Sequence, residues 1–255
     1  MTLGILAAIH DEVDALIAAM RHEDAKATVH RVGMRDYHVG TLHGQPCVLV
    51  LARMGKVAAA ATTVTLIREF GASEIVFTGL AGGVGDATHV GDVVIADATL
   101  QHDLDARPFF PRHEVPLLEQ ASFATDAALT AALRQATEDF LRLDLAEAVP
   151  APVRARFGVS APALHLGLIA SGDQFIGAPA AVAELRARLP GLQAVEMEGA
   201  AVGQVCHEYG VPYAVMRTIS DRADDSAHVD FAAFLSEVAS HYSSGVLNRF
   251  LAARR

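Results

Sequence analysis

The sequence predicts an α/β fold with three layers, in which a central mixed sheet is flanked by helices. Short apolar runs alternate with longer stretches of helical spacing along the 255 residues. Charged residues lie at the ends of two of the apolar runs, as expected where the carboxyl ends of buried strands form a ligand site. Because no linker is long enough to separate two units, we expect a single domain spanning residues 1–255.

The first part of the chain predicts two units of strand and helix. Residues 2–9 have the pattern of a buried strand, and an acidic opening leads into a helix over residues 10–20. Residues 37–41 and 46–51 predict a hairpin whose second strand runs into a long Ala-rich helix. The Gly-Lys pair at residues 55–56 lacks the spacing of a Walker motif. We therefore interpret it as a tight strand-to-helix turn.

The middle of the chain predicts three more strands, over residues 73–78, 91–98 and 164–170, and a helical stretch within 122–147. The first of these strands leads into a glycine-rich turn at residues 79–83. Glycines let backbone amides approach a ligand closely, although such a turn alone is more often a plain loop.

The last part of the chain predicts a helix over residues 178–189 and a short strand over 193–197. A helix of small residues then covers 199–210, followed by a buried strand over 211–220. An amphipathic helix over 229–252 ends the chain. Together these elements complete the mixed sheet flanked by helices.

Four charged side chains stand at the ends of the last two predicted strands: Glu196, Glu198, Arg217 and Asp221. Strand alternation puts the two glutamates on one face and Met197 on the other, unless the strand-to-helix junction breaks the alternation. A structural ion pair with a capping aspartate would explain these charges, and so would a ligand site at the carboxyl ends of the strands. The residues alone leave both explanations open.

Composition restricts the class of protein. Hydrophobic residues make up 52% of the chain and aromatic residues only 6%, so the core is built mainly of Ala, Val and Leu. The net charge of -10 argues against binding to nucleic acid or to an anionic membrane and favours a small-molecule partner. Cys47 and Cys206 lie in apolar contexts, as expected for reduced thiols. The N-terminus resembles neither a signal peptide nor a membrane span, so we expect a cytoplasmic protein.

A metal site is not expected. His102, Asp103 and Asp105 could be pictured as a metal-binding set, but no further histidine or second cluster completes it. A network within a loop explains such a triple better. We therefore expect neither a metal nor a cofactor.

The segments AVEMEGAA and VPYAVMRTISDRADD resemble the signature of the purine nucleoside phosphorylase and nucleosidase superfamily, specifically its methylthioadenosine/S-adenosylhomocysteine nucleosidase branch. The segments GILAAIHDEVDAL, GKVAAA, TGLAGG, HDLD and SGDQF agree with it in order, so the resemblance spans roughly Leu3 to Phe234. It implies a partly barrel-like sheet. The implied activity is hydrolysis of the N-glycosidic bond of 5'-methylthioadenosine, S-adenosylhomocysteine or both, releasing adenine.

The resemblance also implies catalytic roles. Asp221 matches the acid that protonates N7 of the purine, Glu198 the partner of the ribose hydroxyls, and Glu12 the base that activates water. Arg217 would organise Glu198 and the water, and Met197 would pack beneath the ribose. From its own segment alone, Glu12 is better explained as an acidic residue that complements a helix dipole.

Other matches imply substrate contacts. Phe175 would stack on the purine while the Ile176 backbone reads its edge, although a core phenylalanine is the plainer interpretation of Phe175 alone. Phe109 would cap the site of a neighbouring subunit, which implies a homodimer. Leu80 replaces a serine that usually helps to position the water. The remaining implied substrate-binding residues are Gly79, Ala81, Glu196 and Ser220.

Three alternatives stay open. A phosphorylase of this superfamily would need arginines in the first loop and before the glycine turn, where AAIHDE and VFTGLAGG have none. A hydrolase of another 5'-modified nucleoside, of the futalosine or adenosyl-hopane type, is kept open by residues 107–116, which depart from the usual pattern. A non-catalytic nucleoside-binding protein would have little need of three carboxylates.

Overall fold

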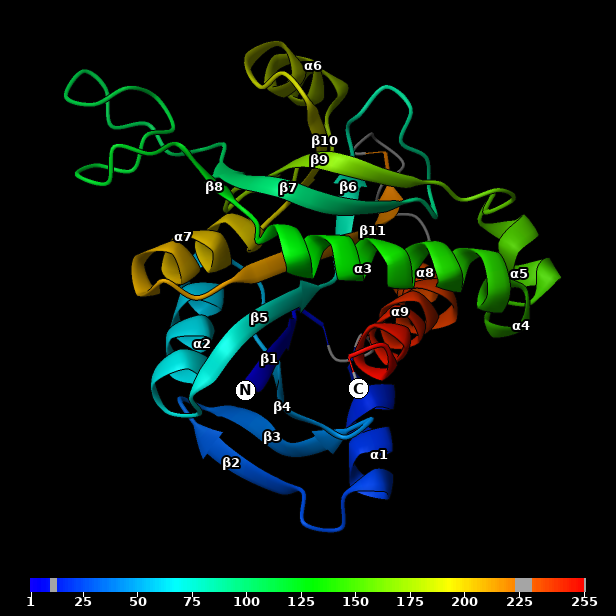
Figure 1. Cartoon of the computed structure of the whole chain (residues 1–255). Coiled ribbons are helices and arrows are strands. Elements are labelled where there is room, and N and C mark those ends of the chain that lie inside the picture. Colours follow the sequence, from blue (N-terminus) through cyan, green and yellow to red (C-terminus); the bar gives the residue numbers. More distant parts are fainter. Residues whose placement is uncertain (10–12, 223–230, 255) are drawn as a thin grey trace.

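The eleven strands of the described chain join one mixed sheet. The structure is a computed structural model that describes residues 1–9, 13–222 and 231–254 (Figure 1). The strands are β1 (Thr2–Ala7), β2 (Thr28–Val32), β3 (Arg35–Leu42), β4 (Gln45–Leu51), β5 (Ala72–Thr78), β6 (Leu80–Gly83), β7 (Val93–Gln101), β8 (Ser122–Ala124), β9 (Leu164–Ser171), β10 (Leu192–Glu196) and β11 (Tyr213–Asp221). Their order in the sheet is β2-β3-β4-β1-β5-β11-β6-β10-β9-β7-β8.

Five of these strands close into a barrel, because β7 pairs back onto β11 at the end of the series β11-β6-β10-β9-β7. Strand β11 connects the two halves of the sheet: Tyr213 pairs in register with Ile75 of β5, and Thr218 with Leu80 of β6. The predicted mixed, partly barrel-like sheet is therefore confirmed. The carboxyl end of β11 therefore belongs to the barrel, where it pairs with β6.

Helices cover both faces of the sheet, as predicted for three layers. They are α1 (Asp14–Glu23), α2 (Lys56–Arg68), α3 (Ala127–Asp139), α4 (Leu145–Ala148), α5 (Ala151–Arg156), α6 (Pro179–Arg188), α7 (Gly199–Tyr209), α8 (Phe231–Phe234) and α9 (Ser240–Ala252). In Figure 1, α2 and α7 lie on the left of the sheet and α1 and α9 on the right.

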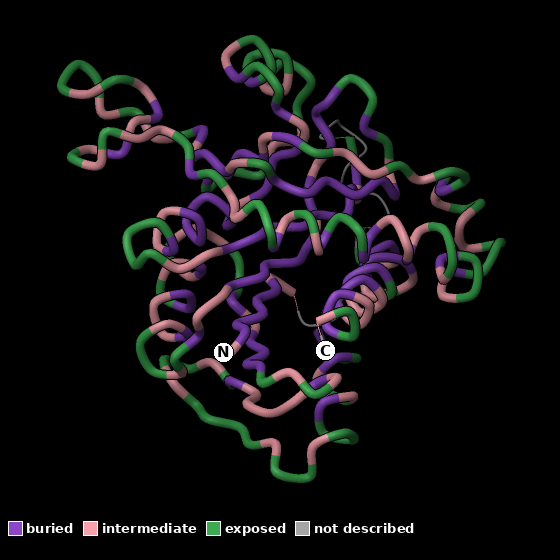
Figure 2. The backbone as a smooth tube through the Cα atoms, viewed as in Figure 1, coloured by how far each residue is buried: buried purple, intermediate pink, exposed green. Residues whose placement is uncertain are grey.

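The alternation of β1 divides the core between these layers. Ile5 packs in the cluster that contains side chains of α1, α3 and α9, whereas Leu6 packs in the cluster of α2 and α7. Figure 2 shows the strands buried through the middle of the molecule, with exposed residues on loops and outer helix faces. Cys47 and Cys206 are both buried and free of disulfides.

Several predicted elements differ in detail. Strand β2 was not predicted because its residues are almost all exposed, so it lacks the apolar pattern of a buried strand. The glycine turn at residues 79–83 forms the short strand β6, where a Cβ on Gly83 would approach Ile219 Cγ2 to 2.9 Å. The predicted C-terminal helix is helical from Phe231 onwards but contains a π-helical turn, Leu235–Ala239. Residues 229–230 lie outside the described residues.

Residues 102–121, between β7 and β8, project from the body of the molecule at the upper left of Figure 1. Asp105 forms ion pairs within this loop, with Arg107 at 2.6 Å and Arg112 at 3.2 Å. Phe109 is 86% exposed there. Among the described helices, none is long and apolar enough to cross a membrane.

Candidate active site

A cavity of about 630 Å³, partly open to solvent, lies at the carboxyl ends of β1, β9, β10 and β11; we call it the main cavity. The predicted site residues that line it are Leu80, Ala81, Phe175, Ile176, Glu196, Met197, Glu198, Ser220 and Asp221. The motifs around Glu196 and Asp221, which are distant in sequence, therefore meet at one hollow.

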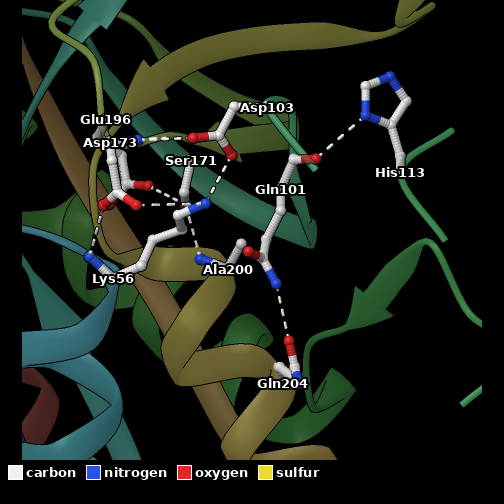
Figure 3. Close-up of polar contacts among 9 residues, drawn as sticks. All are labelled: Lys56, Gln101, Asp103, His113, Ser171, Asp173, Glu196, Ala200 and Gln204. Carbon is white, nitrogen blue, oxygen red and sulfur yellow. Dashed lines mark hydrogen bonds and ion pairs between the residues drawn. The ribbon is translucent and has the colours of Figure 1, made fainter. Parts of the chain in front are cut away.

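Glu196 is buried at the end of β10, and its carboxylate accepts several hydrogen bonds from the start of α7. The backbone N–H of Gly199 donates to its two oxygens at 2.8 and 3.0 Å, and that of Glu198 donates at 3.2 Å. The hydroxyl of Ser171 also donates to it and accepts from the N–H of Ala200 at 2.7 Å (Figure 3). A carboxylate at a helix N-terminus is favoured by the helix dipole as well. Glu196 is thus held rigidly in the cavity wall.

Arg217 completes this arrangement from β11. It is fully buried, and its Nη2 donates to Glu196 Oε2 at 2.6 Å. Its guanidinium lies over the ring of Phe77, 4.0 Å from the centroid. Its carboxylate partner is therefore Glu196 rather than Glu198, and its predicted role in organising Glu198 and the water stays a prediction. Arg217 lies behind the cavity wall, not on its surface.

The junction between β10 and α7 explains this difference. The strand ends at Glu196, and Glu198 already occupies the N-cap position of α7. Consequently the alternation predicted for a continuing strand is broken, and Glu196, Met197 and Glu198 all line the main cavity. Of these three residues, Glu196 is the one whose side chain forms the ion pair with Arg217.

Glu198 is also buried, and its Oε1 accepts a hydrogen bond from the backbone N–H of Gly55 at 2.8 Å. Gly55 has φ +97°, a conformation that favours glycine, and immediately precedes α2. The start of α2 and the start of α7 thus meet at this carboxylate.

Asp221 ends β11 as a buried carboxylate on the main cavity. The hydroxyl of Ser220 donates to its Oδ2 at 2.7 Å. Placed at the end of a buried strand, Asp221 faces the cavity together with Glu198. Two acidic groups from different parts of the sequence can therefore act on one ligand.

The segment after β9 carries Gln174, Phe175 and Ile176 to the cavity. Phe175 is 51% exposed, so the core interpretation of its side chain is wrong. An exposed ring on the wall of a cavity is suited to stacking on a planar ligand. Sequence reasoning did not single out Gln174, although it lies inside the SGDQF segment.

A cluster of charges anchors this segment (Figure 3). Lys56 Nζ lies 2.6 Å from Asp103 Oδ1, and the N–H of Asp173 donates to Asp103 Oδ2 at 2.8 Å. The N–H of Lys56 donates in turn to Asp173 Oδ1 at 3.2 Å. Burial alone would raise the pKa of Asp103, but the hydrogen bonds from Lys56 and Asp173 lower it. Lys56 therefore does more than open a helix.

The remaining predicted residues lie elsewhere. Gly79 is behind the cavity wall, where its carbonyl accepts from the N–H of Thr218, and Phe109 is on the projecting loop. Glu12 lies outside the described residues. Ala8 and Ile9, which sequence reasoning assigned only to a strand, line the cavity, as does Met54.

The suggested metal-binding set does not assemble. Asp103 bonds to Lys56, and Asp105 pairs with arginines of its own loop. His102 is buried next to Gly172, and burial lowers the pKa of its imidazole. In the ranges that the structure describes, no three His, Cys, Asp or Glu residues are grouped to hold a metal ion.

Comparison with known proteins identifies the family of this chain. Residues 2–252 match the phosphorylase superfamily. A 5'-methylthioadenosine/S-adenosylhomocysteine nucleosidase of Actinobacillus succinogenes is 36% identical over 97% of both chains. The crystal structure of the nucleosidase of that name from Neisseria meningitidis, in complex with methylthio-immucillin-A, superimposes with a TM-score of 0.83 at 34% identity and covers 99% of both chains.

A futalosine hydrolase mutant of Helicobacter pylori is also similar, with a TM-score of 0.81 at 27% identity over 98% of both chains. Like the nucleosidases, it is similar over nearly the whole chain. The chain belongs to the phosphorylase superfamily, on its methylthioadenosine/S-adenosylhomocysteine nucleosidase branch.

Proposed function

We propose that this protein hydrolyses the N-glycosidic bond of 5'-methylthioadenosine, S-adenosylhomocysteine or both, releasing adenine and the 5'-thio-ribose. The observation that carries this proposal is the meeting of Asp221 and Glu198 at one cavity beside the exposed ring of Phe175. The names of the relatives with about one-third identity support the same substrates.

Each group has a role in this reaction. The leaving purine gains negative charge while the ribose gains positive charge, so the site must meet both. Asp221 is proposed to protonate N7 of the base, and Glu198 to bind the ribose hydroxyls and stabilise the cationic sugar. Phe175 and Ile176 are proposed to hold the purine, and Met197 the ribose. The base that deprotonates water is proposed to be Glu12, which follows the cavity residue Ile9 by three positions in the sequence.

The lining of the main cavity favours hydrolysis over phosphorolysis. Phosphate as a nucleophile requires convergent cationic donors. Within the described ranges, no arginine, lysine or histidine lines the cavity, because Arg217 is behind the wall and paired with Glu196. Water is therefore the proposed nucleophile.

We further propose a homodimer, in which Phe109 of one subunit caps the main cavity of the other. Support comes from the 86% exposure of an aromatic side chain on a projecting loop that lines no part of its own main cavity. We propose a cytoplasmic location and a place in methionine salvage, where adenine nucleosides bearing a 5'-thio group are broken down.

The test is an assay of free adenine from purified protein. 5'-Methylthioadenosine, S-adenosylhomocysteine, futalosine and unmodified adenosine are supplied separately, with and without inorganic phosphate; for futalosine the released base is hypoxanthine. We expect adenine and a free 5'-thio-ribose from the first two substrates, at a rate that phosphate does not change. A rate that requires phosphate and yields a ribose 1-phosphate would identify a phosphorylase instead.

Futalosine tests the alternative substrate class, which the likeness to the futalosine hydrolase supports. Tight binding of the nucleosides with no base released would indicate a binding protein without activity.

A further inference from the structure

An ion-pair cluster around Lys56 joins three segments that are distant in sequence. Lys56 is the first residue of α2, and its Nζ lies 2.6 Å from Asp103 Oδ1 and 3.5 Å from Asp173 Oδ2 (Figure 3). Its backbone N–H donates to Asp173 Oδ1 at 3.2 Å, and the N–H of Asp173 donates to Asp103 Oδ2 at 2.8 Å. We call these three residues the lysine clamp. It ties the start of α2 to the segment after β9 and to the base of the projecting loop.

The residues next to the clamp belong to the proposed active site. Asp173 directly precedes residues 174–176, which line the main cavity and which we call the cavity segment. Gly55 directly precedes Lys56, and its N–H donates to Glu198 Oε1 at 2.8 Å. A Cβ on Gly55 would lie 3.7 Å from Asp173 Oδ1, so the two residues are in close contact. The clamp therefore links the proposed purine contacts to the carboxylate proposed to bind the ribose.

The cavity segment needs an anchor because of its own structure. Residues 172–178 lie in neither a helix nor a strand. Phe175 is 51% exposed, so packing fixes only part of its ring. It follows Asp173 by two residues, and consecutive Cα atoms are about 3.8 Å apart. A displacement of Asp173 therefore moves the ring that is proposed to stack on the purine.

Stability of the fold does not account for the clamp. The side chain of Lys56 is 16% exposed and that of Asp173 56%. Ion pairs near the surface add little to the free energy of unfolding. The chain has two lysines, Lys26 and Lys56, against 18 arginines. A compact ammonium with three donors suits two carboxylates on different segments, whereas the planar fork of an arginine matches one.

We propose that Lys56 is a positioning residue for cleavage of the glycosidic bond, which holds the cavity segment and Glu198 at the spacing that a bound nucleoside requires. The proposal rests on the nucleosidase function proposed above. Lys56 does not line the main cavity and acts through Asp103, Asp173 and Gly55. Because the base and the ribose must be held together in one reactive geometry, a shift of about 1 Å in either part of the site can lower the rate by up to about 10²-fold.

The kinetic test compares Lys56→Met with Lys26→Met, the same substitution at the other lysine, which is exposed. Methionine is a good helix former and removes the charge. We expect Lys56→Met to raise KM for 5'-methylthioadenosine by roughly 3- to 10-fold and to lower kcat/KM by roughly 10- to 100-fold. Its Tm should fall by no more than about 4 °C. Partial unfolding would lower kcat without raising KM, so the rise in KM distinguishes positioning from lost stability.

Asp103→Asn tests whether the lysine acts through its carboxylate partner. This variant leaves Lys56 in place and supplies the same comparison if Lys56→Met does not fold. In the double variant, kcat/KM should be no lower than in the more damaged single variant, because both substitutions remove one ion pair. Losses that multiply in the double variant would overturn the proposed route through Asp103.

A fluorescence measurement tests the clamp without relying on catalysis. The chain has no tryptophan, so Phe175→Trp places a single reporter on the cavity segment. In that background, Lys56→Met should lower the fluorescence anisotropy of the reporter relative to Lys26→Met, because the segment gains mobility.

An unchanged anisotropy would overturn the proposal, and so would a kcat/KM in Lys56→Met equal to that of Lys26→Met. If the wild-type protein released adenine from neither 5'-methylthioadenosine nor S-adenosylhomocysteine, the nucleosidase function would fail instead. The anisotropy would then decide by itself whether Lys56 holds the cavity segment in place.

Discussion

Arg217 donates to Glu196 at 2.6 Å in a fully buried ion pair, and Glu198, two residues further on, accepts from Gly55 instead. The two glutamates of this short segment therefore have different partners and different roles. Glu196 ties β10, β11 and the start of α7 together, while Glu198 is presented to the main cavity. The ion pair stabilises the wall from which Glu198 acts.

Removing only the arginine should therefore destabilise the fold. We expect Arg217→Met to lower the free energy of unfolding by about 3–5 kcal/mol, because it leaves the Glu196 carboxylate buried without its cation. Urea unfolding measures this loss. In Arg217→Met combined with Glu196→Gln, a substantial part of it should return, since no uncompensated charge remains. Losses that simply add in the double variant would contradict the proposed coupling.

Asp221 is expected to affect chemistry rather than folding. Asp221→Asn keeps the shape and the neighbouring Ser220 but cannot protonate the leaving base, so kcat for adenine release should fall by roughly 10²- to 10⁴-fold. Calorimetry should find nucleoside binding largely retained. Asp97→Asn, at an exposed position of β7, is the matched control. Near-normal turnover in Asp221→Asn would refute the assigned role.

The sequence was enough to place Asp221 and Glu198 near a common site, but not to identify the ion-pair partner of Arg217. Asp221 and Glu198 became candidates because each lies at the end of a predicted buried strand, where strand ends meet at one edge of a sheet, and the family resemblance supplied their roles. The partner of Arg217 could not be found in this way. It depends on the residue at which β10 gives way to α7, and a shift of two residues exchanges Glu196 for Glu198.

Contacts between residues far apart in the sequence could not be predicted either, because they depend on how the elements pack. Lys56 was interpreted only as part of a turn, yet it bonds to Asp103 and Asp173, which are 47 and 117 residues away in sequence. No local pattern carries that information. The layers and the order of strands and helices were predictable because hydrophobic periodicity is local, whereas the exposed strand β2 has no such pattern.

Phe109 tests the proposed dimer. If its ring caps a neighbouring main cavity, Phe109→Ser should raise KM for 5'-methylthioadenosine by roughly tenfold, since apolar burial against the 5' group is lost. Leu143→Ser, at a half-exposed apolar position away from the loop, serves as the control. Light scattering gives the oligomeric state of each protein. A wild-type monomer, or an unchanged KM in Phe109→Ser, would rule out the cap.

His102 should make stability depend on pH. It is 6% exposed, its Nε2 has no hydrogen-bond partner in the described chain, and Gly172 leaves just enough room for its ring. Burial lowers its pKa in the folded state below the ordinary value of 6.5. Above that value the imidazole is neutral in both states and has no effect on stability. As the pH falls through it, the unfolded chain takes up the proton first, so the free energy of unfolding decreases.

The slope of that decrease is the measurable quantity. One such histidine contributes at most about 1.4 kcal/mol per pH unit between its unfolded and folded pKa values. His38 and His113, whose pKa values burial also lowers, add to the wild-type slope. In His102→Asn, urea unfolding between pH 7 and 5 should therefore give a shallower slope, whatever packing the substitution costs at neutral pH. A slope equal to that of the wild type would mean that His102 accepts its proton equally well folded and unfolded, and that burial does not control it.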